Sequence, residues 1–415
     1  MNIEPSTSKH RYQNHVAVGV VMLFVGVAMA AVQYKVPTIL VAVQESFGMD
    51  NDLGSWLMSI FTLMTVFFAI PAGALSQKYS PRLLIGMAGI LAIAGSLLGA
   101  FADLAPVLIV SRAIEGVALC VTTTCGPVVV QKCVRPTKIG TAMGIFGIWG
   151  CVGSVVAMLL TPQLYVSQGY VFTWVFFAIV VLVAVVVMFL YIRIPNRSMR
   201  GAEPSRFADR KLVASDSHTV VMPARPRYLE LFTRDIGLFF AAFLIVNLIF
   251  LAVLGYVPTI LQLQGMEASF SGFVTTLPMM CSVIISPLCG IISDRFGHSK
   301  VLLAVTMLGQ AAGAFLLYTS TGVLLWLGAA LLGLLGTGAM GLVLTVFIRL
   351  LPRPELATIG MGVFATVQGL GQFLGTFLIS LLLGADLSNT MLAGIVIVAL
   401  GVIGSACSLA IRLKS

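Results

Sequence analysis

Three ionisable residues, Lys35, Arg112 and Glu115, fall inside long apolar stretches of the sequence. An ionised side chain costs about 2.5–3.5 kcal/mol at the centre of a membrane helix on insertion scales, so each of the three is a candidate functional group. Counted at about 1.5 Å per helical residue, Lys35 and Arg112 come to a similar depth, toward one side of the membrane. We expect the two cations to act as counter-charges for a bound anion. We expect the carboxylate of Glu115 to gain or lose a proton when the local charge changes.

Arg112 and Glu115 are three residues apart, which puts them on nearly the same face of a helix and permits an ion pair within it. In one interpretation this pair is neutral and Lys35 extends toward the membrane interface. In the other, the three residues form a cavity wall of net positive charge that holds an anion. The residues alone leave both interpretations open.

The composition shows which elements must position these residues. The chain has 415 residues, of which 59% are hydrophobic and only 9% charged, and its mean hydropathy is +1.05. Soluble globular domains are about 25% charged, so this class is excluded. Continuous Leu, Val, Ala and Gly runs favour helices over an alternating β-barrel. We predict an all-α membrane protein with twelve transmembrane helices, including Val16–Gln44, bent at Pro37, and consecutive helices at Ile139–Pro162 and Tyr170–Ile194.

The basic residues predict the orientation. All Lys and Arg residues except Lys35 and Arg112 fall at the termini, in alternate loops or at the helix ends beside them, whereas the opposite loops carry only acidic charges. Basic residues favour the cytoplasmic side, so we expect a multi-pass protein of a cytoplasmic (inner) membrane with both termini cytoplasmic. The net charge of +9 then reflects topology and contact with the lipid bilayer, and no nucleic-acid partner is expected.

The sequence contains an internal duplication. The pentapeptide Val-Pro-Thr-Ile-Leu at 36–40 recurs unchanged at 257–261, and Arg135-Pro136 recurs as Arg353-Pro354 at a nearly equal spacing. Two repeats of six helices each enter the membrane from the same side, as parallel repeats do. We therefore predict an N-terminal six-helix bundle at 1–194, a polar cytoplasmic linker at 195–234 and a C-terminal six-helix bundle at 235–415.

Two loop motifs carry a resemblance to a known family. Residues 290–300 read Gly-Ile-Ile-Ser-Asp-Arg-Phe-Gly-His-Ser-Lys, and residues 73–82 form a looser copy with Gln77 in place of the acid. With the duplication, these motifs resemble the major facilitator superfamily (MFS) across essentially the whole chain. Residues 112–116 also fit that family's helix-4 pattern Arg-x-x-Gln-Gly, with Glu115 replacing Gln. The spacing around helices 1 and 5 is loosely similar to cyanate/nitroimidazole-type members.

The resemblance implies a fold and a set of roles. Helices 1, 4, 7 and 10 of this family line a central cavity, so Lys35 and Arg112 are expected on its wall. Asp294 and Arg295 are expected to act as a conformational latch, and Glu115 to couple transport to protons. The second half offers neutral polar groups instead of charges. The expected substrate-binding residues are Lys35, Arg112, Tyr34, Asn247, Tyr256 and Gln368.

The predicted function is secondary active transport of a small organic or inorganic anion by alternating access, coupled to protons, in a monomer. All four histidines lie at termini or in loops, the cysteines lack metal-ligand spacing, and no phosphate-binding loop is present. No metal, no cofactor and no enzymatic activity are therefore expected. Two alternatives stay open, a proton-coupled drug exporter and a non-transporting membrane sensor.

Overall fold

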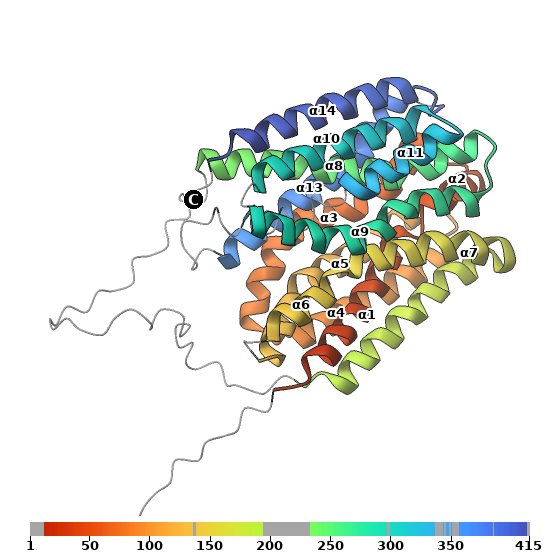
Figure 1. Cartoon of the computed structure of the whole chain (residues 1–415). Helices are drawn as coiled ribbons and strands as arrows, with labels where there is room; N and C mark the ends of the chain where they lie inside the picture. The colour runs from red at the N-terminus through yellow and green to blue at the C-terminus, as the bar shows by residue number, and fades with distance from the viewer. Residues whose placement is uncertain are drawn as a thin grey trace, which may run out of the picture.

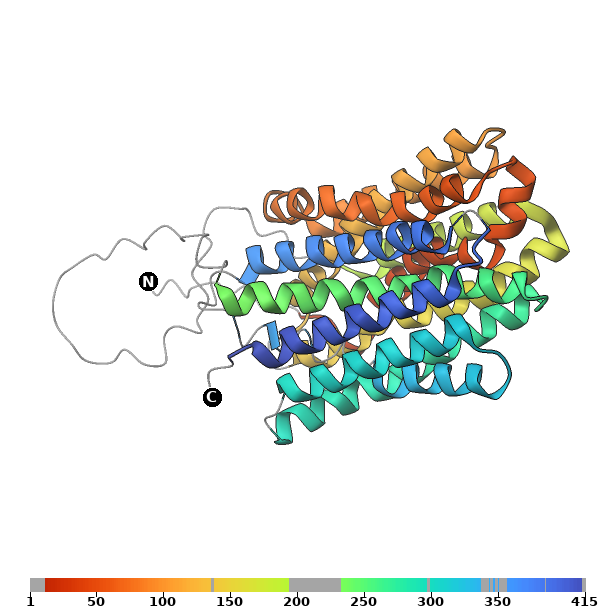
Figure 2. The same ribbon diagram turned by 90° about the horizontal axis from the view of Figure 1, so that it is seen from above.

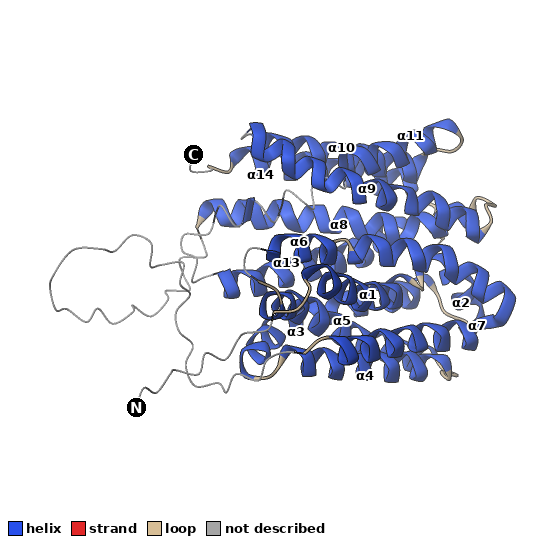
Figure 3. Ribbon diagram, turned by 60° about the horizontal axis from the view of Figure 1, so that its bottom comes forward, coloured by secondary structure: helices blue, strands red, loops and turns tan. Residues whose placement is uncertain are grey.

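The computed structural model describes residues 12–135, 138–193, 233–296, 299–336, 343, 346–347, 350, 357–384 and 386–412. Within these ranges, side chains are described except at 77, 140, 283–284, 286–296, 299 and 357–359. The described residues form helices joined by short connections and include no β-strand (Figure 3). The predicted all-α fold is therefore confirmed.

The helices of the first half follow the apolar stretches of the sequence, and several begin at a residue that favours helix N-termini. Asn14 caps the first helix by accepting a hydrogen bond from the Val16 backbone, and Asp50 caps another through Leu53. The elements are α1 (His15–Tyr34), η1 (Pro37–Ile39), α2 (Leu40–Phe47), α3 (Asn51–Lys78), α4 (Pro81–Ala100), α5 (Ala105–Cys133), α6 (Ile139–Gly147) and α7 (Trp149–Tyr191).

The second half begins at α8, which the hydroxyl of Thr233 caps by accepting a hydrogen bond from the Ile236 backbone. Its elements are α8 (Arg234–Leu263), α9 (Ala268–Phe296), α10 (Ser299–Thr319), α11 (Val323–Leu331), the π-helical turn η4 (Leu332–Gly336), α13 (Ala357–Leu383) and α14 (Thr390–Ala410). The predicted linker at 195–234 lies outside the described residues except for its last two positions.

Nine helical segments of the described chain are long and apolar enough to cross a membrane. One of them, Thr141–Tyr191, contains both of the helices predicted at Ile139–Pro162 and Tyr170–Ile194, because α7 turns at Gly169, where φ is 82°. This left-handed conformation favours glycine, since a side chain would clash there. The structure thus supports a multi-pass helical protein, and the number of twelve crossings stays a prediction.

The helices run roughly side by side, as Figure 2 shows. We call the end at which α1 begins and α14 ends the terminal end, and the opposite end the far end. Figure 1 shows α8, α10, α11 and α14 along one side of the bundle and α1, α4, α6 and α7 along the other. Between the two halves, α3 packs against α13 and α7 packs against α9. These two seams hold the halves together.

The first helix is interrupted at Pro37, as predicted. α1 ends at Tyr34, and a 3-10 turn over Pro37–Ile39 connects it to α2. Proline has no backbone N–H, so the carbonyl four residues earlier, that of Gln33, lacks its usual helical donor. The same pentapeptide in the second half causes no interruption, because α8 continues through Pro258. The interruption in α1 matters for the site described below.

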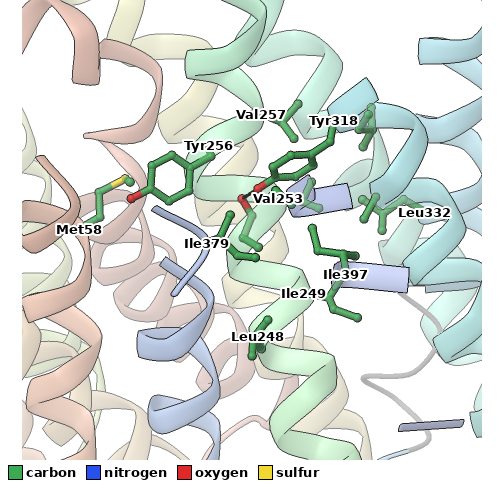
Figure 4. Close-up of a cluster of buried hydrophobic side chains, with 14 of the residues drawn as sticks. Met58, Leu248, Ile249, Val253, Tyr256, Val257, Tyr318, Leu332, Ile379 and Ile397 are labelled. Carbon is green, nitrogen blue, oxygen red and sulfur yellow. Dashed lines mark hydrogen bonds between the residues drawn. The ribbon is translucent and has the colours of Figure 1, made fainter. Parts of the chain in front are cut away.

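The buried apolar side chains form two clusters, one of which lies mostly in each half. In the second half, α8, α10, α13 and α14 bring together side chains such as Ile249, Val253, Ile379 and Ile397, with Tyr318 among them (Figure 4). Tyr318 donates a hydrogen bond of 2.7 Å to the Ala252 carbonyl oxygen, so its hydroxyl is satisfied inside the core. The first half contains a separate apolar cluster. Among the described residues, the buried charged side chains are Lys35, Arg112 and Glu115, and all three lie in the first half.

Candidate functional site

Glu115 on α5 is the centre of a buried ionic cluster. Its Oε1 accepts a hydrogen bond of 2.7 Å from Lys35 Nζ and another from the Ser96 hydroxyl. Its Oε2 accepts one of 2.6 Å from Arg112 Nη1. One carboxylate therefore bridges two cations, each of which reaches a different oxygen. We call Lys35, Arg112 and Glu115 the ionic trio.

Arg112 connects α5 to the interrupted end of α1. Its Nη1 donates to the Val32 carbonyl oxygen at 2.7 Å, and its Nη2 donates to the Gln33 carbonyl oxygen at 2.9 Å. Carbonyls in the last turn of a helix lack helical donors, and Pro37 cannot supply one to Gln33. The ring of Phe61 on α3 covers the guanidinium, with Cζ 4.5 Å from the ring centroid. Arg112 thereby satisfies the carbonyls that the interruption exposes.

Lys35 follows α1 directly and points into the first half. Its Nζ lies 3.3 Å from the Ser96 hydroxyl on α4 and 4.7 Å from the centroid of the Trp174 ring on α7. The ammonium group is therefore surrounded by α4, α5 and α7. In the sequence-based interpretation of a neutral pair, Lys35 extends to the membrane interface. The structure differs, because the ion pair with Glu115 keeps this side chain inside the bundle.

A glycine on α4 permits the close approach that the trio requires. A Cβ atom at Gly95 would lie 2.9 Å from Cγ of Glu115 and 3.0 Å from the Ser111 carbonyl oxygen. Small residues at helix interfaces in membranes let backbones come this close. Because Gly95 precedes Ser96, the same contact delivers the Ser96 hydroxyl to the carboxylate. The sequence thus places a small residue and a donor side by side.

The trio is shielded from solvent and carries a net charge. The exposed fractions of Lys35, Arg112 and Glu115 are 0%, 1% and 1%. Two cations and one carboxylate leave a net charge of +1 when all three are ionised. The intrahelical pair between Arg112 and Glu115 is present, as one interpretation predicted. The net positive charge was the feature of the other interpretation. Both features occur together in this arrangement, so the two interpretations are compatible.

A small cavity lies between the halves, next to Arg112. Its volume is about 20 Å³, enough for a water molecule. Five helical segments and the turn η1 contribute side chains to it. They are Gln33, Tyr34 and Pro37 from the first helix and its turn, Met58 and Thr62 from α3, Arg112 from α5, Leu251 and Gly255 from α8, and Thr376 from α13. Lys35 is not among the lining residues.

The far end of this cavity is closed by contacts between the halves. The Ser59 hydroxyl on α3 lies 2.7 Å from that of Thr376 on α13, and Trp56 packs its ring 5.4 Å from that of Phe377. Next to them, Gln262 Nε2 on α8 donates to the Thr38 carbonyl oxygen at 2.9 Å. A central cavity between two helical halves, sealed at one end, is a typical site in secondary transporters.

A match between this sequence and a family profile identifies the family. The profile described as Major Facilitator Superfamily matches this chain over residues 21–376 and again over 264–413. The chain belongs to the Major Facilitator Superfamily. The resemblance inferred from the loop motifs is therefore confirmed. The likeness to cyanate/nitroimidazole-type members stays a prediction.

Individual relatives in the superfamily are distant. An uncharacterized MFS-type transporter of Bacillus subtilis, YybF, is 23% identical over 277 residues, which is 66% of this chain and 64% of YybF. An uncharacterized MFS-type transporter of Schizosaccharomyces pombe is 26% identical over 184 residues, 43% of this chain and 40% of the relative. The chain thus matches less than two thirds of the length of either relative.

Solved structures of superfamily transporters share the fold. A bacterial homologue of the human lysosomal transporter Spinster superposes with a TM-score of 0.74 at 14% identity, covering 96% of this chain and 98% of that one. The nucleoside transporter NupG superposes with a TM-score of 0.73 at 12% identity, covering 95% and 99%. At such low identity the similarity concerns the arrangement of helices alone.

Of the other predicted site residues, Tyr34 on α1 lines the cavity, and the remaining three are spread over the second half. Asn247 on α8 is fully buried, and its Nδ2 donates to the Phe243 carbonyl oxygen at 2.9 Å. Tyr256 is buried on α8, and its hydroxyl lies toward the sulfur of Met58, a cavity residue (Figure 4). Gln368 is half-buried on α13 and does not line the cavity. The three therefore do not gather around the ionic trio.

The predicted latch falls at the terminal end. Asp294 and Arg295 occupy the last turn of α9, and their side chains lie outside the described part of the chain. Their role as a latch within this superfamily fold stays a prediction.

Sequence reasoning missed two residues of the site. Ser96 binds Glu115 and Lys35, and Gln33 lines the cavity beside Arg112. A signal for Gln33 was present, because a polar residue four positions before Pro37 lies at the helix interruption. Ser96 gave no comparable signal, since a serine in a membrane helix commonly bonds its own helix backbone.

Proposed function

We propose that this chain is a secondary active transporter that moves a small anion across the membrane by alternating access, with protons as the coupling ion. The observation that carries the proposal is the net positive charge of the ionic trio, of which Arg112 faces the cavity between the halves. A buried net charge is costly in a membrane and is retained where it serves a function. An anion entering the cavity supplies the missing counter-charge.

The geometry of Glu115 supports proton coupling. Both carboxylate oxygens accept hydrogen bonds from the two cations, so the carboxylate competes with any anion for Arg112. A proton on Glu115 would raise the net charge of the trio from +1 to +2 and weaken its hold on Arg112. An anion bound to Arg112 would then restore the original charge. Proton and anion therefore favour each other's binding, as reciprocal linkage requires for symport.

The superfamily membership supports the mechanism. Two halves that meet along α3–α13 and α7–α9 enclose the cavity, and closure at the far end matches one state of an alternating-access cycle. On this proposal the halves correspond to residues 1–194 and 235–415, joined by the linker at 195–234. We further propose a monomer in a cytoplasmic (inner) membrane, with both termini on the cytoplasmic side.

The decisive experiment is uptake into proteoliposomes. A panel of labelled anions is offered with and without a pH gradient, to the wild type and to Arg112→Gln and Lys35→Gln. We expect at least one anion to accumulate, faster with an inwardly directed proton gradient, and both variants to lose accumulation. Glu115→Gln tests the coupling, because any uptake that the folded fraction of this variant retains should not respond to the gradient.

Three other outcomes contradict the proposal in distinct ways. Uptake of no anion by the wild type refutes anion transport. Proton-driven extrusion of amphipathic drugs with Lys35→Gln still active would favour the exporter instead. Binding of an anion without any flux would favour a sensor.

A further inference from the structure

Arg112 has two N–H groups that no acceptor among the described residues uses. A guanidinium group carries five N–H donors. Nη1 donates one hydrogen bond to the Val32 carbonyl oxygen and one to Glu115, and Nη2 donates one to the Gln33 carbonyl oxygen. The Nε–H is buried and has no partner among the described residues. Nε and one hydrogen of Nη2 form an edge of the guanidinium that can bind a carboxylate with two parallel hydrogen bonds, and the Nε–H of this edge is unpaired in the described part of the chain.

Gln33, which also lines the cavity, carries a further unpaired donor. Its side chain is 7% exposed, and its Nε2 is buried without a partner in the described part of the chain. Gln33 and Arg112 both line the cavity. Buried N–H groups almost always have acceptors in native proteins, so unpaired donors in one cavity indicate a missing acceptor. Arg112 offers donors alone, and Gln33 offers a donor through Nε2 and an acceptor through Oε1.

The other walls of the cavity carry no charged group, and Tyr34 adds one hydroxyl to them. The Thr62 hydroxyl already donates to the Ser59 carbonyl oxygen, and the Thr376 hydroxyl is bonded to that of Ser59. Pro37, Met58 and Leu251 supply apolar atoms. A ligand that fits this cavity has one oxyanion and an apolar remainder. Phosphate or a dicarboxylate would leave a charge against an apolar wall.

We propose that Gln33 and the free edge of Arg112 form a carboxylate subsite, and that the transported anion is a small aliphatic monocarboxylate. The carboxylate oxygens accept hydrogen bonds from Arg112 Nε and Nη2 and from Gln33 Nε2. The apolar remainder lies against Met58 and Leu251. This inference rests on the proposed function and names its substrate class and a specificity-determining residue, Gln33. The cavity of about 20 Å³ holds one water, so the substrate binds when the halves separate.

The test uses radiolabelled propionate in proteoliposomes, with propionamide and nitrate as competitors. We expect the wild type to accumulate propionate and propionamide not to compete, because the neutral amide lacks the charge that Arg112 binds. Gln33→Met is similar in length but has no donor, and it should raise the KM for propionate about tenfold or more, the usual effect of losing a hydrogen bond to a charged group.

Two further variants separate binding from folding. Thr122→Val removes a buried hydroxyl that lies outside the cavity lining and donates to the Ala118 carbonyl oxygen of its own helix, α5, so its KM should match the wild type. Gln33→Glu places a carboxylate beside the free edge of Arg112. It should raise the midpoint of thermal unfolding and abolish propionate uptake, because the new carboxylate occupies the subsite. A purely structural glutamine would not produce this opposite pair of effects.

The outcomes distinguish the two proposals. If the wild type accumulates propionate and Gln33→Met keeps the wild-type KM, the subsite is wrong and anion transport stands. If the wild type moves nitrate or phosphate but no monocarboxylate, the substrate class is wrong and anion transport again stands. If the wild type moves no anion of the panel, both proposals fail. If Gln33→Met does not fold, uptake by Gln33→Glu decides, and propionate uptake by that variant refutes the subsite.

Discussion

The pentapeptide Val-Pro-Thr-Ile-Leu occurs twice in this chain and adopts two different structures. At 36–40 it interrupts a helix, because α1 ends at Tyr34 and a 3-10 turn covers Pro37–Ile39. At 257–261 it lies within α8, which stays helical to Leu263. Both copies are buried. Five identical residues therefore do not determine whether the helix breaks.

The difference comes from the partners of the two segments. In the first half, Arg112 supplies donors to the carbonyls of Val32 and Gln33, so an interrupted helix leaves few polar groups unsatisfied. In the second half, no charged side chain lies at the corresponding place, and Tyr318 donates to the Ala252 carbonyl. The residue before the pentapeptide differs accordingly, with Lys35 in one copy and Tyr256 in the other. A charged interior thus accompanies the broken helix, and an apolar interior accompanies the continuous one.

The strongest way to break this contrast is to remove the carboxylate. Glu115→Gln leaves Lys35 and Arg112 buried without a counter-charge, and uncompensated buried charges cost about 3–5 kcal/mol. We expect a large fall in the midpoint of thermal unfolding of the detergent-solubilised protein. Glu45→Gln, on an exposed position of α2, is the matched control and should leave the midpoint unchanged. Equal midpoints for the two variants would contradict a structural role for the trio.

The next effect concerns Ser96. Ser96→Ala removes the hydroxyl that donates to Glu115, and a hydrogen bond to a charged group contributes about 1.5–3 kcal/mol. Equilibrium unfolding in denaturant should show a loss in this range. Ser111→Ala is a suitable control, because that buried hydroxyl donates to the Leu108 carbonyl oxygen of its own helix. If both alanine variants have the same free energy of unfolding, the Ser96 hydroxyl does not stabilise the ionic trio.

The two prolines test the comparison most directly. Pro258→Ala restores a backbone N–H inside a continuous helix, so stability should rise by about 1 kcal/mol. Pro37→Ala introduces an N–H that competes with Arg112 for the Gln33 carbonyl, so stability should not rise and anion uptake should fall. Unfolding midpoints and uptake are measured for both variants. Equal responses would show that Arg112 does not stabilise the interruption.

The smallest effect is expected in the apolar half. Tyr256→Phe removes a hydroxyl that faces the Met58 sulfur, a weak acceptor, so the unfolding free energy should change by less than about 0.5 kcal/mol. Tyr318→Phe removes a hydroxyl with a backbone acceptor and should cost about 1 kcal/mol. A cost for Tyr256→Phe above that for Tyr318→Phe would show that the Tyr256 hydroxyl has a strong partner, for which the nearby Ser380 side chain is the candidate.

Much of the fold follows from the sequence, because long apolar stretches have few alternatives to membrane helices. The bend at Pro37 and the superfamily were predicted and are confirmed, and the pairing of Arg112 with Glu115, which the residues alone left open, is present. Helix 5, predicted as one segment from Ile139, is divided at Ile148 into α6 and α7. Nothing in the apolar pattern marks this division.

The direction of side chains was harder to predict than the position of helices. A helix that is apolar on all faces gives no periodicity from which to read which face meets the cavity. Lys35 was therefore expected on the cavity wall, whereas its ammonium group lies between α4, α5 and α7. Gln33, two residues earlier, lines the cavity instead. Only tertiary contacts distinguish these neighbours.

The interruption at Pro37 also has a mechanical consequence. Arg112 ties the end of α1 to α5, while Gln262 and Thr259 on α8 hold the turn through the carbonyls of Thr38 and Pro37. Any displacement of α5 relative to α8 therefore stretches or twists the few peptide units between Gln33 and Pro37. The conformation of this short stretch therefore changes when the two halves move relative to each other. A pair of spectroscopic labels on either side of it would report that motion.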